Sequence, residues 1–151
     1  MHLLDDTVSA ADLAYANQDD HERNLYSFKG GQIYTPGSDD NLWNAAYERI
    51  YTFNTIINNV LSSTDATDAE KHRLRAEALY QRAFEYLALV NIYARHYHKE
   101  TAATDYGIPL ITKDLVDQTY TRATVAEVYK QIEDDLKEAS KSLKEVPILS
   151  L

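Results

Sequence analysis

Apolar side chains recur at helical spacing over three stretches of the chain, at about residues 40–61, 68–97 and 125–143. Positions three and four apart share one face of an α-helix, so each stretch is expected to bury one side. The expected buried stripes are Trp43, Tyr47, Ile50, Asn54, Ile57 and Leu61; then Ala76, Leu79, Ala83, Tyr86, Val90, Tyr93 and Tyr97; then Val125, Val128, Tyr129, Ile132, Leu136, Ala139 and Leu143. The pattern predicts an all-α fold.

Two capping boxes support the expected starts of the second and third helices. Thr67 is followed three residues later by Glu70, and Thr124 is followed in the same way by Glu127. In this motif the threonine and the glutamate each satisfy a backbone N–H that the first helical turn leaves without a partner. The first helix follows a polar run at residues 38–40, which supplies its N-cap.

The chain divides by composition into three segments. Residues 1–38 carry glycine and proline pairs, and we expect an irregular N-terminal segment with one short helix at residues 8–15. Residues 39–145 hold the helices and a loop at 98–123, which is long enough to suggest function or docking. Residues 146–151 form an apolar tail without a capping signal, so we expect a truncated tail and a fragment of a larger α-helical fold.

Charge and composition exclude several classes of function. The 151 residues include 15 Lys and Arg against 24 Asp and Glu, a net charge of -9, which argues against nucleic acid as a partner. The absence of cysteine rules out disulfides, a thiolate zinc site and a cysteine nucleophile. Tyrosine is unusually abundant, at 12 residues beside 3 Phe and 1 Trp, and suits both helix packing and binding faces.

No motif for catalysis, metal binding or a cofactor occurs in the sequence. The chain has no HExxH, GxSxG, phosphate-binding loop or GxGxxG, and its histidines do not recur at ligand spacing. The many acidic residues fall mostly on the polar faces of the expected helices. We therefore expect no enzyme activity, no metal site and no cofactor.

The first two helices form an antiparallel pair joined by a short linker, the unit of a tetratricopeptide-like array. Four motifs then follow one another in a fixed order over about residues 40–145. They are Trp43-x3-Tyr47-x2-Ile50-x3-Asn54; residues 76–87, with Glu77, Arg82 and Tyr86; Tyr106-Gly107-Ile108-Pro109-Leu110; and Arg122 to Tyr129 followed by Ile132, Asp135, Leu136, Ala139 and Leu143. This ordered set resembles the N-terminal part of the SusD/RagB family.

The resemblance implies a fold, a location and a function. Members of this family are all-helical, tetratricopeptide-like nutrient-binding lipoproteins on the outer-membrane surface of Bacteroidetes. They bind oligosaccharides or polysaccharides without bond chemistry and cover a SusC-like TonB-dependent transporter. The anchoring cysteine and the signal peptide of the family do not occur in this chain. We therefore expect contact with the membrane only through a lipid anchor that this chain lacks.

Five residues beside the glycine-rich segment form a candidate glycan site. They are Tyr26, Phe28, Tyr34, Asp39 and Asn41. Aromatic faces suit the C–H surfaces of sugar rings, and amides and carboxylates suit their hydroxyls. The alternative is that these aromatics pin the irregular segment to the first helix. For Tyr106 and Tyr120 of the long loop, three roles remain open: binding glycan, packing against the helices and docking to the transporter.

Three residues of the helix motifs are interpreted as structural. Trp43 lies on a packing stripe, although an indole also suits a sugar platform. Asn54 is polar on an apolar stripe, so we expect it to bond the backbone of a neighbouring helix or loop. Arg82 faces the buried side and requires a carboxylate partner, for which Asp135 and Glu77 are the candidates.

Three functional hypotheses remain from the sequence. The first is a SusD-like glycan-binding protein. The second is a tetratricopeptide-like module that binds a protein partner and has no sugar site. The third, a glycosidase, rests only on the fact that acidic and aromatic residues also line such clefts.

Overall fold

In this computed structural model, residues 12–28, 39–114 and 120–143 are described. The chain divides into two units, residues 1–40 and residues 41–151, and each is described by itself.

The first unit contains two short helices, α1 (Asp12–Ala16) and α2 (Asp20–Tyr26). Part of α1 coincides with the short helix expected at residues 8–15, of which residues 8–11 lie outside the described residues. Helix α2 lies in a segment expected to be irregular. It carries no apolar stripe and none of its residues is buried, so periodicity gives no signal for it. A glutamate at its first turn, Glu22, accepts the backbone N–H of Asp19 at 3.2 Å.

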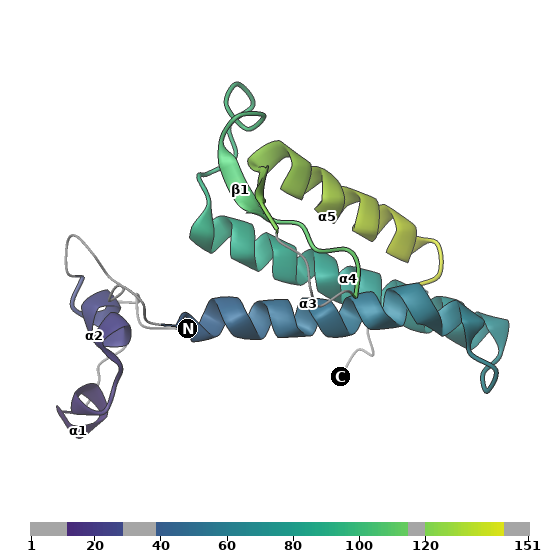
Figure 1. The fold of residues 1–151 in the computed structure, drawn as a ribbon, viewed down its shortest axis with the longest axis horizontal. Coiled ribbons are helices and arrows are strands. Elements are labelled where there is room, and N and C mark those ends of the chain that lie inside the picture. The colour runs from purple at the N-terminus through teal and green to yellow at the C-terminus, as the bar shows by residue number, and fades with distance from the viewer. Residues whose placement is uncertain (1–11, 29–38, 115–119, 144–151) are drawn as a thin grey trace, which may run out of the picture. The chain divides into compact units, whose positions relative to one another are not determined.

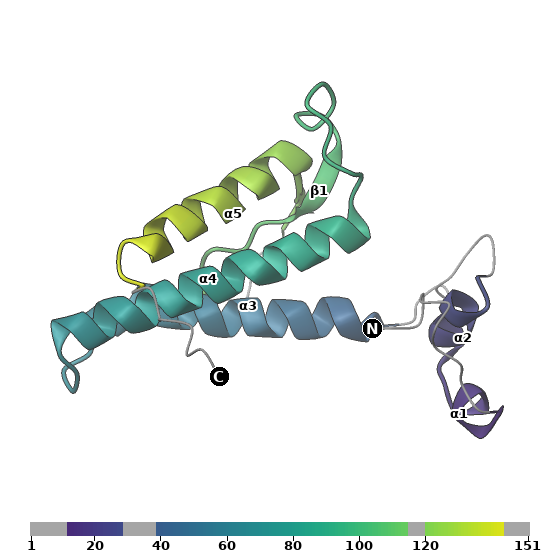
Figure 2. The same ribbon diagram turned by 180° about the vertical axis from the view of Figure 1, so that it is seen from behind.

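Three helices form the second unit: α3 (Asn41–Asn59), α4 (Asp68–Tyr93) and α5 (Val125–Ser140). A short 3-10 turn, η1 (Val60–Ser62), continues α3. Figures 1 and 2 show α4 between α3 and α5, and α4 packs against both of them. The all-α fold predicted from the sequence is thereby confirmed. Within the described residues, no helix is both long enough and apolar enough to cross a membrane.

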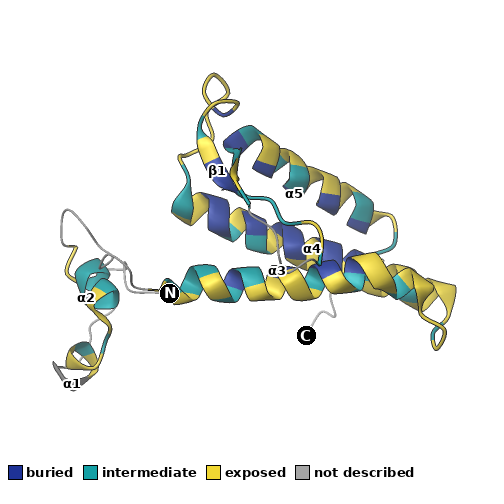
Figure 3. Cartoon of the chain, in the orientation of Figure 1, coloured by how far each residue is buried: buried dark blue, intermediate teal, exposed yellow. Residues whose placement is uncertain are grey.

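The buried sides of these helices meet in two core clusters. The larger one contains Ile50 of α3, Tyr86 of α4 and Val128 of α5, all at 0% exposure. The smaller one joins Ile57 to Leu79 and their neighbours at the other end of the bundle. Figure 3 shows the buried positions along the facing sides of α4 and α5. Most positions of the stripes read from the sequence form this core. Leu61 and Leu136, which were expected on the buried stripes, are instead 44% and 40% exposed.

Helix α4 ends four residues earlier than the periodicity predicts. Ala94 leaves the helix in an extended conformation, with φ -127° and ψ 170°, while its N–H still bonds to the carbonyl of Val90. Tyr97 was expected on the buried stripe, but it lies past the end of the helix and is 45% exposed. The apolar repeat in the sequence continues to Tyr97, although the helix ends at Tyr93.

Both predicted capping boxes are present. At α4, the Thr67 hydroxyl accepts the Glu70 N–H at 3.3 Å, and the Glu70 carboxylate accepts the Thr67 N–H at 2.9 Å. At α5 the corresponding distances for Thr124 and Glu127 are 3.2 and 2.7 Å.

The long connection between α4 and α5 is not the structureless loop expected from the sequence. It contains an antiparallel pair of strands, β1 (Tyr106–Pro109) and β2 (Arg122–Thr124). A Cβ at Gly107 would lie 2.9 Å from the carbonyl oxygens of both Ala123 and Thr124, so only glycine fits there. The strands are only four and three residues long, and β1 contains a glycine, so the sequence shows no alternation of apolar and polar residues that would reveal them. Residues 115–119 of the connection lie outside the described residues.

Candidate functional site

A buried polar cluster joins the three long helices. The Arg82 guanidinium donates to both carboxylate oxygens of Asp135, at 2.8 and 2.7 Å, and to Asn54 Oδ1 at 2.7 Å. These three residues are 4%, 3% and 0% exposed, so the charge pair is withdrawn from water and its geometry is bidentate. Gln131 Nε2 also donates to Asp135 at 2.8 Å.

This cluster decides the two structural predictions made for Asn54 and Arg82. Asp135, rather than Glu77, is the partner of Arg82, because Glu77 turns outward and accepts from Arg73 at 2.7 Å. Asn54 bonds a loop backbone as expected, since its Nδ2 donates to the Ile111 carbonyl at 2.7 Å. Its Oδ1 also accepts from Arg82, a bond for which the sequence gives no signal.

The segment that follows β1 is tied along α3 by side-chain hydrogen bonds. The Tyr47 hydroxyl donates to the Pro109 carbonyl at 2.8 Å. Further along α3, the side chains of Asn58 and Asn59 donate to the carboxylate of Asp114, at 3.3 and 3.1 Å. These bonds hold the pKa of the Asp114 carboxyl below its usual value, with the bond from Asn59 as the largest cause.

Tyr86 of α4 fixes the centre of the same segment. Its hydroxyl donates to the Ile111 carbonyl at 2.6 Å and accepts the Ile111 N–H at 3.0 Å. Burial raises the pKa of the Tyr86 and Tyr47 hydroxyls well above the usual value of 10.0, so both stay protonated and remain donors at physiological pH. The backbone around Ile111 is therefore held rigidly against α3 and α4.

This arrangement leaves an open hollow of about 640 Å³ beside α3, which we call the α3 hollow. Its lining residues are Trp43, Asn44, Tyr47, Glu48, Tyr51, Thr52, Ile111 and Tyr120. The volume falls in the range of about 300–1,000 Å³ that is usual for small-molecule sites. Two rows on α3 face it: aromatic residues at 43, 47 and 51, and polar residues at 44, 48 and 52. A spacing of four keeps each row on one side of the helix.

The aromatic row is partly embedded in the core. The ring centroid of Trp43 lies 4.9 Å from that of Tyr47 and 4.9 Å from that of Tyr93, the latter at 90°. Trp43 is half-buried against the larger core cluster, which agrees with its predicted packing role, and it also lines the hollow. Tyr51 is 45% exposed. The α3 hollow thus presents ring surface beside exposed amide, carboxylate and hydroxyl groups.

The five residues singled out from the sequence as a glycan site lie in different parts of the chain. Tyr26 ends α2, where its ring centroid lies 5.6 Å from that of Tyr15, and Phe28 is 65% exposed with φ 50°. Tyr34 lies outside the described residues. Asp39 is exposed in the first unit, and Asn41 is exposed at the start of α3 in the second. Their part in binding stays a prediction.

The α3 hollow itself was missed at the sequence level. The signal that could have found it is the pairing of an aromatic with a polar residue at every fourth position, Trp43-Asn44, Tyr47-Glu48 and Tyr51-Thr52. From the sequence, Trp43 and Tyr47 were assigned to helix packing, and the polar residues next to them were not considered. Across the residues that the structure describes, no three His, Asp or Glu side chains are placed to hold a metal ion.

Comparison with known proteins assigns the chain to a family. A family model described as SusD-like, "Starch-binding associating with outer membrane", matches residues 5–149. The chain belongs to the SusD-like family. The resemblance noted from the four ordered motifs is thereby confirmed. No curated protein matches the chain.

Two solved structures match the helical fold. A SusD superfamily protein from Bacteroides thetaiotaomicron is 28% identical, with a TM-score of 0.63 over 68% of this chain. A protein from Bacteroides vulgatus described as a putative sugar binding protein is 29% identical, with a TM-score of 0.68 over 80% of this chain. The SusD-like chain studied here spans only 23% and 27% of the lengths of those two proteins.

Proposed function

We propose that this SusD-like chain binds glycan and that the α3 hollow contributes to the binding surface. The observation that carries the proposal is the aromatic row at 43, 47 and 51 beside the polar row at 44, 48 and 52, in a chain whose family model is described as starch-binding. Sugar rings stack their C–H faces on aromatic rings, and their hydroxyls pair with amide and carboxylate groups.

The hydrogen bonds that hold the segment around Ile111 support binding indirectly. Asn54 and Tyr86 fix Ile111, and Tyr47 fixes Pro109, so the wall of the hollow is already in place before a ligand arrives. A site that is ordered in advance loses less conformational entropy on binding. No step of bond chemistry is part of this function, so the chain acts as a binding protein rather than an enzyme.

The proposed function includes a transporter partner and a lipid anchor, as the resemblance to the family implies. The glycan is passed to a SusC-like TonB-dependent transporter at the outer membrane, and a lipid anchor holds the complete protein at the cell surface. The description of the family model, "Starch-binding associating with outer membrane", supports the location, and the transporter and the lipid anchor come from the resemblance to the SusD/RagB family. Tyr26, Phe28, Tyr34, Asp39 and Asn41 are proposed as further residues that contact glycan.

A direct test is electrophoresis of the 151-residue chain through native gels that contain starch, other neutral polysaccharides or none. We expect retardation by at least one polysaccharide and a weaker shift for Tyr51→Ala, which removes an exposed ring from the hollow. Tyr80→Ala is the matched control, because Tyr80 is similarly exposed, at 47%, but does not line the α3 hollow. Equal mobility of the chain in every gel would overturn the proposal.

One observation favours the alternative, a module that binds a protein partner. A groove of about 180 Å³ between α4 and α5 is lined by Tyr80, Ala83, Phe84, Leu87, Ile132 and Leu136. Phe84 is 59% exposed and Leu136 is 40% exposed, so large apolar surface faces water there. An amphipathic helix of a partner fits such a groove. This alternative has no sugar site, so it predicts that no polysaccharide retards the chain while the SusC-like transporter co-purifies with it. It also predicts that Phe84→Ser abolishes that capture.

A further inference from the structure

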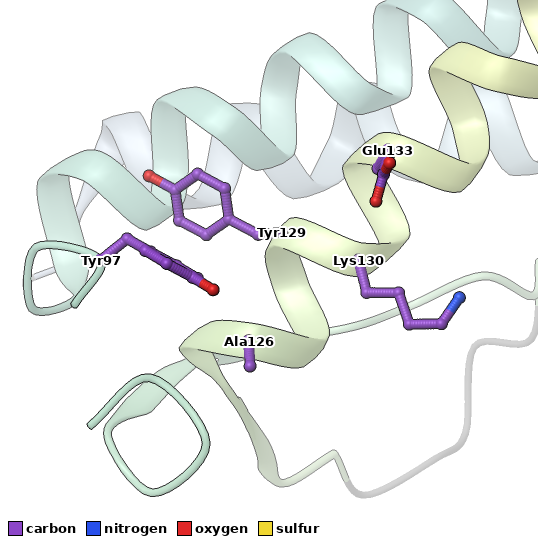
Figure 4. Close-up of a pocket in the computed structure, with 5 residues that line it drawn as sticks. All are labelled: Tyr97, Ala126, Tyr129, Lys130 and Glu133. Carbon is purple, nitrogen blue, oxygen red and sulfur yellow. The ribbon is translucent and has the colours of Figure 1, made fainter. Parts of the chain in front are cut away.

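Tyr97 lies where the helix no longer dictates the direction of its side chain. Because α4 ends at Tyr93, Tyr97 falls in the non-helical stretch that follows and is 45% exposed. Its ring packs edge-on against that of Tyr129 on α5, with centroids 5.0 Å apart and planes at 67° (Figure 4). The Tyr129 hydroxyl donates to Asn91 Oδ1 of α4 at 3.3 Å. The two rings are therefore held at a fixed angle near the surface.

These rings belong to a second hollow, between the end of α4 and the start of α5, which we call the Tyr97 hollow. It measures about 490 Å³ and is lined by Tyr97, Ala126, Tyr129, Lys130 and Glu133, none of which lines the α3 hollow. Figure 4 shows the Tyr97 and Tyr129 rings on the left, the Lys130 and Glu133 side chains on the right, and the short Ala126 side chain below them. Ala126 lines the hollow with a single methyl group, so it takes up little of this space.

The charges at its rim cancel. Lys130 pairs with Asp134 at 2.5 Å, and Lys137 pairs with Glu133 at 2.5 Å, and all four side chains are more than half exposed. Exposed ion pairs four residues apart on a helix are weak, so a ligand hydroxyl can replace either partner at small cost. A rim with donors, acceptors and no net charge suits a neutral, hydroxyl-rich ligand better than an anion.

We propose that the Tyr97 hollow is a second glycan subsite, which takes one ring of a neutral oligosaccharide. The Tyr97 ring supplies the stacking face, Lys130 donates to a sugar hydroxyl, and Glu133 accepts from another. This inference rests on the proposed function, because it assumes that the chain binds glycan. Two subsites on one chain strengthen the hold on a polymer, since the second contact forms at high effective concentration.

The test is a two-dimensional NMR titration of the 151-residue chain with maltoheptaose and with neutral β-linked glucan, xylan and mannan oligosaccharides of six or seven units. The variants are Tyr97→Ala, Tyr97→Phe and Ala126→Trp. The control is Tyr80→Ala, which removes a similarly exposed tyrosine, at 47%, that lines neither hollow. We expect Tyr97→Ala and Ala126→Trp to weaken the affinity measured at the Tyr129 ring by about tenfold, the effect of losing one aromatic contact. Tyr97→Phe keeps the ring and should bind normally.

The outcomes separate the two proposals. If Trp43 responds to an oligosaccharide while the Tyr97 and Tyr129 rings do not, or if Tyr97→Ala binds like the wild type at this hollow, the second subsite is wrong and the first stands. If no neutral oligosaccharide shifts any signal, both are wrong. Stronger binding of oligogalacturonate than of every neutral oligosaccharide would contradict the argument from the balanced charges.

Discussion

At the scale of single residues, the contact between Arg82 and Asp135 holds the helices to one another. The sequence predicts that the buried Arg82 guanidinium has a carboxylate partner, with Asp135 and Glu77 as the candidates. Position on the helix decided between them: Asp135 lies across on α5, whereas Glu77 shares α4 with Arg82 and pairs with Arg73. The sequence could not show this choice, because it depends on how α5 packs against α4.

We predict that Arg82→Leu destabilises the chain by about 3–5 kcal/mol, because it leaves Asp135 charged and buried without its partner. Urea unfolding followed by circular dichroism measures the change. The double variant Arg82→Leu, Asp135→Leu is expected to lose less stability than Arg82→Leu alone, since no unpaired charge then remains. An Arg82→Leu chain as stable as the wild type would contradict the structural role of this pair.

At the scale of elements, the ends of the helices differ in how far they can be predicted. The starts of α4 and α5 follow from Thr-x-x-Glu, because capping is a local contact between residues three apart. The end of α4 does not, because no glycine or proline marks it and the apolar repeat runs on to Tyr97. The strands β1 and β2 depend on pairing across a long connection, which local patterns do not contain.

The cap of α5 gives a prediction for stability and one for pH. Thr124→Ala should lower the free energy of unfolding by about 1 kcal/mol, measured by urea unfolding, whereas Thr121→Ala, which changes an exposed threonine just before the cap, should lower it little.

The hydrogen bonds from the Thr124 N–H and the Thr124 hydroxyl lower the pKa of Glu127 below its usual 4.5. The stabilisation is therefore complete above pH 4.5 and is lost as the pH falls through the lowered pKa. Equal acid sensitivity in Glu127→Gln, which has no carboxylate to protonate, and the wild type would contradict this.

The strand pair gives a sharper prediction. Gly107→Ala places a methyl group 2.9 Å from two backbone carbonyl oxygens, neither of which can move without breaking the pair of strands. We expect a loss of about 1–3 kcal/mol and faster amide exchange in β1 and β2. Ala103→Gly, in the same connection, is the control for a change of one methyl group. Unchanged exchange in Gly107→Ala would show that the strands are not packed as described.

At the scale of the whole molecule, the all-α fold and the SusD-like family were both accessible from the sequence, because long stripes and four ordered motifs carry them. The α3 hollow was not accessible in the same way. It needs the segment around Ile111 to lie along α3, and that placement comes from hydrogen bonds of Asn54, Tyr86 and Tyr47 across large separations in sequence. Packing explains much of the tyrosine content, but Tyr51 and Tyr97 remain available at the surface.

The most direct test of glycan binding at the α3 hollow uses the intrinsic fluorescence of Trp43, which is the single tryptophan of the chain and lines that hollow. Titration with soluble starch and with the neutral oligosaccharides named above is predicted to give a saturable change in its emission. The change should be weakened in Tyr51→Ala and retained in Tyr80→Ala. Emission that stays constant with every glycan, in a chain shown to be folded by circular dichroism, would contradict the account.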